Sequence, residues 1–301
     1  MRAVVTGGAG FIGSHVVDAL LGRGDDVHIL DNLASGKREN VPANAQLHVG
    51  DIRSDCEELF DEVRPEACFH FAAQADVRVS VDRPDFDADV NVLGTVRVLE
   101  AARKYGAKIV FASTGGAIYG ECTEPASEDA PRRPLAPYGT AKLAGEEYIQ
   151  TYNRLYRSSH TVLRYGNVYG PRQDPHGEAG VVAIFMNRLR TGDAPRIFGD
   201  GTQARDYVYV TDAVGAAVAA LQSNSGVYNV ATAQGTSVVE LLERIQRVAG
   251  TRAEPEFTDA RPGELQRSVL DVSRAARELG WRAAHDLDAG LAATWAWMTE
   301  R

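Results

Sequence analysis

The stretch RAVVTGGAGFIGSHVVDALLGRGDDVHILD, residues 2–31, decides the fold class. It opens with a β-branched run at 2–6, continues with a glycine-rich turn at 7–13, and then repeats apolar residues with the period of a helix. The run DVHILD at 26–31 predicts a second strand. Strand, glycine turn, helix and strand form a βαβ unit, in which a right-handed crossover places both strands parallel in one sheet.

The glycines of this turn predict a dinucleotide site. We expect Gly8 and Gly10 to let the backbone turn tightly and approach a pyrophosphate, and Gly13 to let the helix lie against the strand. The N-terminus of the helix then offers free N–H groups and a partial positive charge to the anion.

Asp31, at the end of the second strand, selects the cofactor. Its carboxylate can accept hydrogen bonds from the adenosine ribose hydroxyls and repels a 2′-phosphate. Lys37 and Arg38 follow closely enough to leave NADP open, although such loop residues are more often solvated. The sequence therefore favours NAD.

The totals fit one large globular domain, or a domain and a half, of 301 residues. We expect no membrane span, because no run of about 18 apolar residues occurs, and no signal peptide, because the N-terminus lacks a cleavage site. Three scattered cysteines form neither a disulfide framework nor a metal spacing, which favours the cytoplasm and no metal. The net charge of −9 and the lack of a basic stripe argue against nucleic acid as a partner.

Strand-like and helix-like segments alternate along the rest of the chain. We expect strands at 45–52, 66–73, 108–113, 159–170, 206–210 and 226–231, and helices at 85–105, 138–157, 211–222, 237–249 and 273–280. Several strands are continuous apolar runs, which is typical of a parallel sheet covered on both faces. This pattern predicts an α/β fold: a Rossmann-type doubly wound parallel sheet at 1–167, to which later segments return, and a smaller mixed α/β lobe at 168–301 for the substrate.

Ligands of such sheets bind outside the carboxyl ends of the strands. The segment GDI (50–52) follows one expected strand, and we expect Asp51 to read the adenine amine there. The small residues Ala72 and Ala73 follow another, where the backbone must pass close to a cofactor.

Six segments together resemble one family: TGGAGFIG (6–13), DN (31–32), GDI (50–52), HFAAQ (70–74), YGTAK (138–142) and LRYGNVYGPRQ (163–173). The chain is similar to the extended short-chain dehydrogenase/reductases, especially the nucleotide-sugar epimerases of the UDP-glucose (UDP-galactose) 4-epimerase type. The resemblance continues through GDGTQARDYVYV (199–210) and RPGELQRS (261–268).

The resemblance implies NAD-dependent 4-epimerisation of a UDP-hexose through a transient 4-keto sugar, including the N-acetyl forms. Tyr138 and Lys142 match the catalytic pair of the family. A free tyrosine is a poor base at neutral pH, and a lysine one helical turn away favours its phenolate. Tyr138 then takes the proton of the sugar 4-hydroxyl while NAD takes the hydride from C4.

One position departs from the family, which usually has a Ser or Thr where this chain has Gly115. We expect Thr114 to supply the missing hydroxyl, with Ser113 or a water molecule as the alternatives. Gly116 and Ala117 stand where related dehydratases carry acidic residues. Neither residue can transfer a proton, which argues against dehydration.

The remaining contacts are carried over from the family by position. Cofactor contacts are expected from Gly7, Gly10, Phe11, Ile12, Gly13, Asp31, Asn32, Asp51, Ile52, Phe71, Ala72, Ala73, Gln74, Asn91, Ser113, Tyr138, Lys142 and Tyr165. Substrate contacts are expected from Thr114, Gly115, Asn167, Val181, Arg205, Arg261, Glu264 and Ser268.

Within the substrate set, Arg205 and Arg261 are expected to bind the diphosphate, although either arginine could instead form a surface ion pair. Glu264 is expected at a ribose hydroxyl and Ser268 beside the C2 substituent of the sugar. Uridine is the family's usual base, and thymidine stays open.

Other functions remain open on the sequence alone. They are a 4-epimerase of another nucleotide sugar such as a UDP-uronate, a 4-keto reductase, and a non-enzymatic NAD-sensing regulator. The regulator is disfavoured because such proteins typically lose the Tyr or the Lys. The resemblance also implies a homodimer in which 85–105 and 138–157 form a shared four-helix bundle, although both apolar faces could be buried within one chain.

Overall fold

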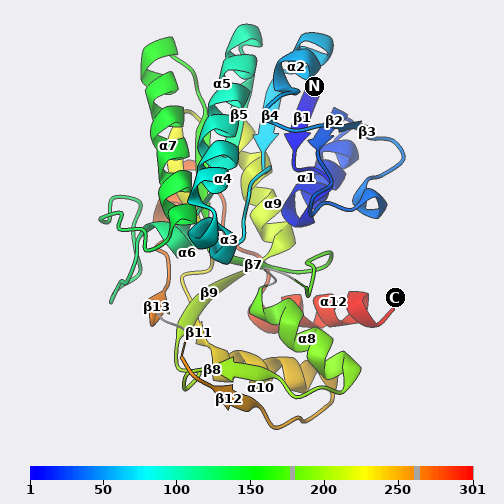
Figure 1. Cartoon of the computed structure of the whole chain (residues 1–301), viewed down its shortest axis with the longest axis vertical. Coiled ribbons are helices and arrows are strands. Elements are labelled where there is room, and N and C mark those ends of the chain that lie inside the picture. Colours follow the sequence, from blue (N-terminus) through cyan, green and yellow to red (C-terminus); the bar gives the residue numbers. More distant parts are fainter. Residues whose placement is uncertain (177–179, 261–264, 301) are drawn as a thin grey trace.

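A parallel sheet of seven strands forms the larger part of the molecule (Figure 1). The computed structural model describes residues 1–176, 180–260 and 265–300. The strand order is β10-β6-β5-β4-β1-β2-β3, and the bounds are β1 (Arg2–Thr6), β2 (Asp26–Asp31), β3 (Gln46–Val49), β4 (Ala67–His70), β5 (Lys108–Thr114), β6 (Thr161–Tyr165) and β10 (Gly226–Val230). The order reverses between β1 and β4, the point at which doubly wound sheets bind their ligands.

Helices cover both faces of this sheet. One face packs on α1 (Phe11–Gly22), α9 (Val210–Ala219) and α11 (Ser273–Glu278), and the other on α2 (Cys56–Val63), α5 (Gly94–Tyr105) and α7 (Pro137–Tyr156). Successive strand residues enter opposite cores, as Val4 and Val5 do, which explains the continuous apolar runs. The predicted α/β fold class is confirmed.

The expected helix at 85–105 is divided into three parts. Helix α4 (Pro84–Ala88) leads into a π-helical turn, η2 (Asp89–Leu93), and then into α5. The Thr95 hydroxyl donates to the Asn91 carbonyl at 2.7 Å within this turn. Sequence periodicity does not reveal such a turn, because the extra residue changes the hydrogen-bond pattern without breaking the helix.

The expected strand at 159–170 is two strands in two sheets. After β6 the chain turns at Gly166, whose N–H donates to the Val230 carbonyl, and β7 (Asn167–Tyr169) pairs with a strand of the smaller lobe. That lobe contains β8 (Arg196–Phe198), β9 (Ala204–Tyr209), β11 (Gly235–Ser237), β12 (Glu256–Thr258), β13 (Arg267–Ser268), α8 (Val181–Thr191), α10 (Val238–Ala249) and α12 (Leu287–Thr299). The division between residues 167 and 168 stays a prediction, while α9 and β10 do return to the larger sheet.

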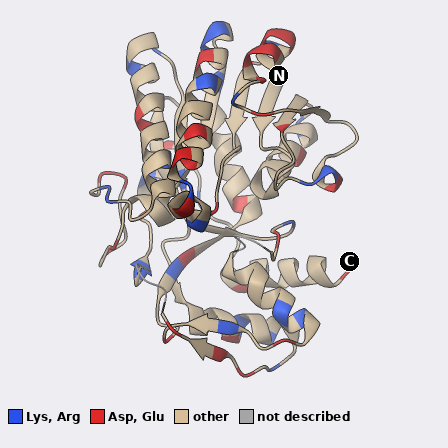
Figure 2. Cartoon of the chain, viewed as in Figure 1, with Lys and Arg blue, Asp and Glu red and all other residues tan. Residues whose placement is uncertain are grey.

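Short elements complete the described chain: α3 (Val77–Asp82), α6 (Gly115–Ile118), and the 3-10 turns η1 (Arg38–Asn40) and η3 (Ala220–Gln222). Within the described residues, no helix is both long and apolar enough to cross a membrane. Figure 2 shows acidic and basic residues interspersed along the helices of the face in view.

Candidate active site

The turn after β1 lies tightly against the loop after β4. Gly7 has a φ of +71°, and a Cβ placed on it would stand 2.6 Å from the Ala72 nitrogen. A Cβ on Gly13 would stand 2.1 Å from the Gly7 carbonyl oxygen. Both positions therefore require glycine, and the loops of two adjacent strands meet at the switch point.

Gly8 and Gly10 lie in the turn at 7–10, as expected, and Gly8 also packs against Ile29, since a Cβ on Gly8 would lie 2.8 Å from the Ile29 side chain. Their approach to a pyrophosphate stays a prediction. Gly10 is the N-cap of α1 and provides no side-chain cap. The first N–H groups of a helix lack partners within it, so this uncapped end can receive an anion.

Asp31 lies buried at the end of β2, 7% exposed. Its carboxylate accepts hydrogen bonds from the Ala9 N–H at 2.9 Å and from the Leu33 N–H at 2.8 Å. These bonds hold the carboxylate between the glycine turn and the next loop. Lys37, which kept NADP open, forms an ion pair with Asp174 at 3.2 Å.

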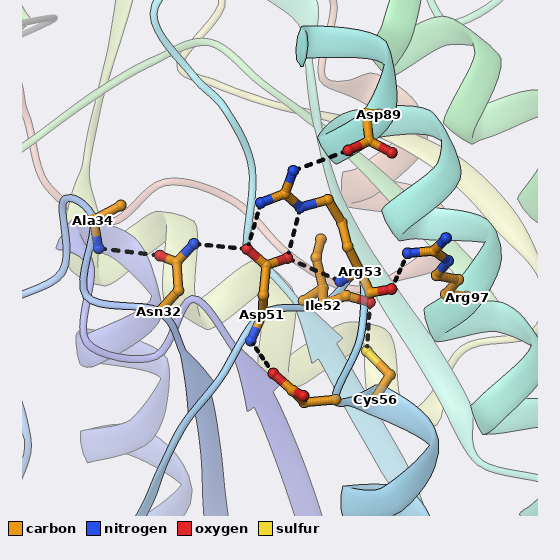
Figure 3. A network of polar contacts seen from close by, with 9 residues as sticks. Asn32, Ala34, Asp51, Ile52, Arg53, Cys56, Asp89 and Arg97 are labelled. Atoms are coloured by element: carbon orange, nitrogen blue, oxygen red, sulfur yellow. Dashed lines mark hydrogen bonds and ion pairs between the residues drawn. The ribbon is translucent and has the colours of Figure 1, made fainter.

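Asp51 stands beyond the end of β3 in a network of polar contacts (Figure 3). The Arg53 side chain donates to both of its carboxylate oxygens at 2.9 Å, and Asn32 Nδ2 donates to Oδ2 at 3.1 Å. Hydrogen bonds from Arg53 hold the pKa of Asp51 at about 2, although partial burial opposes this shift. Asp51 is therefore an anion at any physiological pH. Its neighbour Ile52 is buried in the core.

Gln74 ends the loop that follows β4 and is held by Asn91 of η2. Its N–H donates to Asn91 Oδ1 at 3.0 Å, and Asn91 Nδ2 donates back to its carbonyl at 2.8 Å. The buried Asp87 accepts from both side chains at 2.8 and 2.9 Å. These bonds hold the loop after β4 that contains Phe71, Ala72 and Ala73, and the centre of the Phe71 ring lies 6.2 Å from that of the buried Tyr165 ring.

Helix α7 carries the expected catalytic pair. It begins at Pro137, whose fixed φ suits the first helical position. Tyr138 follows, half-buried, and Lys142 lies one turn further on, 3% exposed. Lys142 Nζ donates to the Ala112 carbonyl at 3.0 Å and lies 4.9 Å from the centre of the Phe111 ring. Burial lowers the pKa of Lys142 to about 8, against the opposing charges of Asp87 and Glu146.

Thr114 ends β5 and is half-buried. Its Oγ1 and the Oδ1 of Asn167 lie 3.8 and 3.6 Å from the point where a Cβ on Gly116 would stand. Helix α6, which starts directly after Thr114, packs against α7. The hydroxyl of Thr114 and the amide of Asn167 thus both lie near Gly116, and α6 contacts the first turn of α7, where a Cβ on Gly139 would stand 2.5 Å from the Ala117 carbonyl oxygen.

Gly115 has no hydroxyl, and the hydroxyl of the neighbouring Ser113 is already engaged. A Cβ on Gly115 would come within 2.4 Å of the buried Leu270 side chain. The Ser113 hydroxyl donates to Glu146 Oε1 at 2.5 Å. The hydroxyl of Ser113 is thus engaged with Glu146, and Thr114 stays the expected donor, with a water molecule as the alternative.

A buried ion pair between α7 and β6 was not predicted from the sequence. Glu146 and Arg164 are each 2% exposed, and Arg164 Nη2 lies 2.6 Å from Glu146 Oε2. Arg164 also donates to the Tyr119 hydroxyl at 2.8 Å. The signal was present in the helix, because Tyr138, Lys142 and Glu146 repeat every four residues along one face.

The lobe side of the site is formed by neighbouring strands. Ser268 on β13 is in register with Arg205 on β9, and Ser268 is 7% exposed. Asn167 on β7 pairs with the far end of the same β9. Val181 is the first residue of α8. The expected contacts Arg261 and Glu264 lie outside the described residues.

A comparison with protein families gives one extensive match. The Epimerase family model, described as the NAD dependent epimerase/dehydratase family, matches residues 3–231. The chain therefore belongs to this family, and the expected class, an NAD-dependent epimerase and thus an isomerase, is confirmed.

Individual relatives are similar over their whole length. A putative UDP-glucose 4-epimerase of Methanocaldococcus jannaschii is 48% identical over 98% of this chain and 97% of its own. The UDP-glucose 4-epimerase of Thermotoga maritima, solved with UDP-glucose, has a TM-score of 0.98 and 45% identity over 100% of this chain and 99% of its own. The UDP-glucose 4-epimerase of Thermus thermophilus, solved with NAD, has a TM-score of 0.95 and 48% identity over 99% of both chains.

Proposed function

We propose that this chain interconverts UDP-glucose and UDP-galactose by NAD-dependent 4-epimerisation. The observation that carries the proposal is the buried Lys142, one helical turn from Tyr138, beside the strand end that presents Thr114. The relatives from Methanocaldococcus jannaschii, Thermotoga maritima and Thermus thermophilus, at 45–48% identity, bear the names of UDP-glucose 4-epimerases.

The residues present fit NAD. Gly7 and Gly13 hold the glycine turn tightly against the loop after β4 and against α1, and the N-terminus of α1, which has no side-chain cap, offers its first N–H groups to the pyrophosphate. In this proposal Asp31 binds the ribose hydroxyls and Asp51 binds the adenine amine. NAD, when bound, supplies the acceptor for the hydride of sugar C4 and returns it to that carbon.

Tyr138 is the base in this proposal. Lys142 stays protonated below about pH 8, and its positive charge one turn away favours the Tyr138 phenolate. Tyr138 accepts the proton of the sugar 4-hydroxyl and later returns it. Thr114 donates a hydrogen bond to the same sugar oxygen and orients it.

Arg205 and Arg261 bind the diphosphate of the substrate, and Glu264 binds its ribose. Arginine suits this role because its planar guanidinium matches phosphate oxygens and keeps its charge at any relevant pH. Ser268, small and adjacent to Arg205 across the strand pair, leaves space beside sugar C2. We therefore include the N-acetylated UDP-hexoses among the substrates.

A panel of UDP-sugars tests the proposal. The purified protein should convert UDP-galactose to UDP-glucose without added cofactor, with both isomers followed by NMR. A stoichiometric requirement for NADPH would favour a 4-keto reductase instead. If the protein converts a UDP-uronate and no UDP-hexose, its substrates are UDP-uronates.

We further propose a homodimer that works in the cytoplasm. Helix α7 exposes Tyr148, Leu155 and Tyr156, at 43%, 65% and 44%, on a single face. Apolar side chains gathered in this way on a helix are typical of an association surface. Cys56 and Cys68 are buried, unpaired thiols, which suits a reducing compartment.

A further inference from the structure

Arg53 is held in place from three sides (Figure 3). Its guanidinium donates to both oxygens of Asp51 and, through Nη1, to Asp89 Oδ2 at 2.9 Å. Its main-chain carbonyl accepts a hydrogen bond from the Arg97 guanidinium of α5. Since Asp89 belongs to η2, Arg53 joins the loop after β3 to the helical segment that also carries Asn91.

The acceptor positions of the Asp51 carboxylate are all occupied. A carboxylate offers about four of them. Oδ1 accepts from the Arg53 main-chain N–H and from Arg53 Nε, both at 2.9 Å. Oδ2 accepts from Arg53 Nη2 at 2.9 Å and from Asn32 Nδ2 at 3.1 Å. Three of the four bonds thus come from one residue.

Asn32 is the exchangeable partner of this carboxylate. It is exposed, its bond is the longest of the four, and in Figure 3 it approaches the Asp51 carboxylate from the left, whereas the Arg53 guanidinium lies above the carboxylate. Asn32 also follows Asp31 directly, so its side of the carboxylate faces the strand that receives the adenosine ribose in the proposed NAD site. An amine arriving from there would meet Oδ2 where the Asn32 amide now donates.

We infer that Arg53 is a positioning residue for the cofactor. Its three hydrogen bonds leave the Asp51 carboxylate one acceptor position, which is aimed at the exocyclic amine of adenine. This inference rests on the proposed NAD site. Without the two guanidinium bonds, the carboxylate keeps only the bonds from Asn32 and from the main-chain N–H of residue 53, and it loses the paired, coplanar contact that fixes its plane. Arg53 thereby determines which purine the site prefers rather than taking part in the chemistry.

A competition between two dinucleotides tests the inference. Nicotinamide hypoxanthine dinucleotide differs from NAD in carrying a ring carbonyl where adenine has its amine, so it presents an acceptor to the carboxylate. Purified protein is equilibrated with an excess of both dinucleotides in equal amounts, freed of unbound dinucleotide, and denatured. The ratio of the two released dinucleotides gives the relative affinity.

We expect the wild type to prefer NAD by about 10-fold or more, the scale of one hydrogen bond to a charged group. Arg53→Gln should reduce this preference to about 3-fold or less. Arg53→Lys keeps the charge but not the paired guanidinium bonds, and its preference for NAD should lie between those of the wild type and Arg53→Gln. Arg244→Gln is the matched control, because Arg244 also bridges two carboxylates, Glu240 and Asp288, and its side chain is likewise 31% exposed. It should leave the preference unchanged.

If both Arg53 variants lose the two dinucleotides equally, Arg53 has a structural role alone and the inference is overturned. An Arg53 variant with the wild-type preference for NAD, or a wild type that shows no preference for NAD, would also overturn it. Thermal melting of each variant confirms that it is folded. Epimerase turnover of the wild type is measured separately. Its absence would refute the proposed function while the binding ratio still decides the role of Arg53.

Discussion

At the scale of the residue, the Leu270 side chain packs against Gly115, where the family usually has a hydroxyl. The Leu270 side chain fills the space that a side chain at 115 would enter, and it lies within 2.4 Å of the point where a Cβ on Gly115 would stand. Adding even a small group to a formed core costs about 1–3 kcal/mol. In the proposed site, Thr114 supplies the hydroxyl from the preceding position.

Thr114→Val should lower turnover by roughly 10-fold or more, since it removes one hydrogen bond to the reacting oxygen and keeps the shape of the side chain. Steady-state kinetics with UDP-galactose measure this. Thr114→Ser, which restores a hydroxyl, should recover most of the activity. If the valine variant turns over like the wild type, a water molecule orients the sugar and Thr114 has no such role.

Ser268→Tyr should abolish activity on UDP-N-acetylglucosamine and largely spare UDP-glucose. Ser268 is buried beside Arg205, so a tyrosine ring has no free solvent to enter and fills the space beside sugar C2 instead. Relative kcat/KM on the two sugars measures the effect. A wild type that rejects the N-acetyl sugar would mean that another residue closes the pocket.

Residues whose role depends on local sequence can be predicted, and those whose role depends on distant partners cannot. Asp31 and Lys142 follow from their places after a strand and within one helical turn, and the structure buries both. The glycine turn appears within 7–13 as expected, but the contact of Gly8 with Ile29 could not be foreseen, because only the fold brings the Ile29 side chain beside Gly8. The position of the Arg53 guanidinium could not be predicted, since its hydrogen bond to Asp89 joins residues 36 positions apart in the chain.

At the scale of the element, α7 carries the proposed catalytic pair and is also part of the core. The exposed face carries Tyr148 and Leu155, and the buried face carries Lys142 and Glu146. Glu146 joins α7 to β6 through Arg164, at 2.6 to 3.1 Å. This ion pair fixes the helix against the sheet that presents Thr114.

Glu146→Gln should lower the free energy of unfolding by about 3–5 kcal/mol, because it leaves the buried Arg164 without a counter-charge. Chemical denaturation measures the change. Glu147→Gln is the control from the next position, since Glu147 pairs with Arg132 on the surface, where such pairs contribute about 0–1 kcal/mol. Similar effects of the two changes would contradict a supporting role for the buried pair.

Elements can be predicted where periodicity decides them and are missed where tertiary packing does. The βαβ unit at 2–31 and the helices at 138–157 and 237–249 appear within a residue or two of expectation. The strand at 159–170 is expected as one piece, because its apolar pattern continues through the point where the chain changes sheets at Gly166. Hydrophobic pattern does not record which sheet a residue joins.

At the scale of the whole molecule, the exposed apolar face of α7 predicts association. Leu155 is 65% exposed on that face. In solution the chain should have about twice its mass of 32.5 kDa. Leu155→Arg should shift it toward the monomer, because a charge would have to be buried in the interface. Phe257→Arg, at a similarly exposed position on β12, should leave the dimer unchanged. Light scattering measures the mass, and a monomeric wild type would contradict the proposed dimer.

The central claim is that the hydride leaves sugar C4 and returns to the same carbon on its other face. UDP-galactose carrying deuterium at C4 tests this directly, with purified protein, no added cofactor and NMR detection. The UDP-glucose formed should keep the deuterium at C4, and Tyr138→Phe should form product at least ~100-fold more slowly. Product that has exchanged its C4 deuterium for solvent hydrogen, or product formed at the wild-type rate by Tyr138→Phe, would contradict the account.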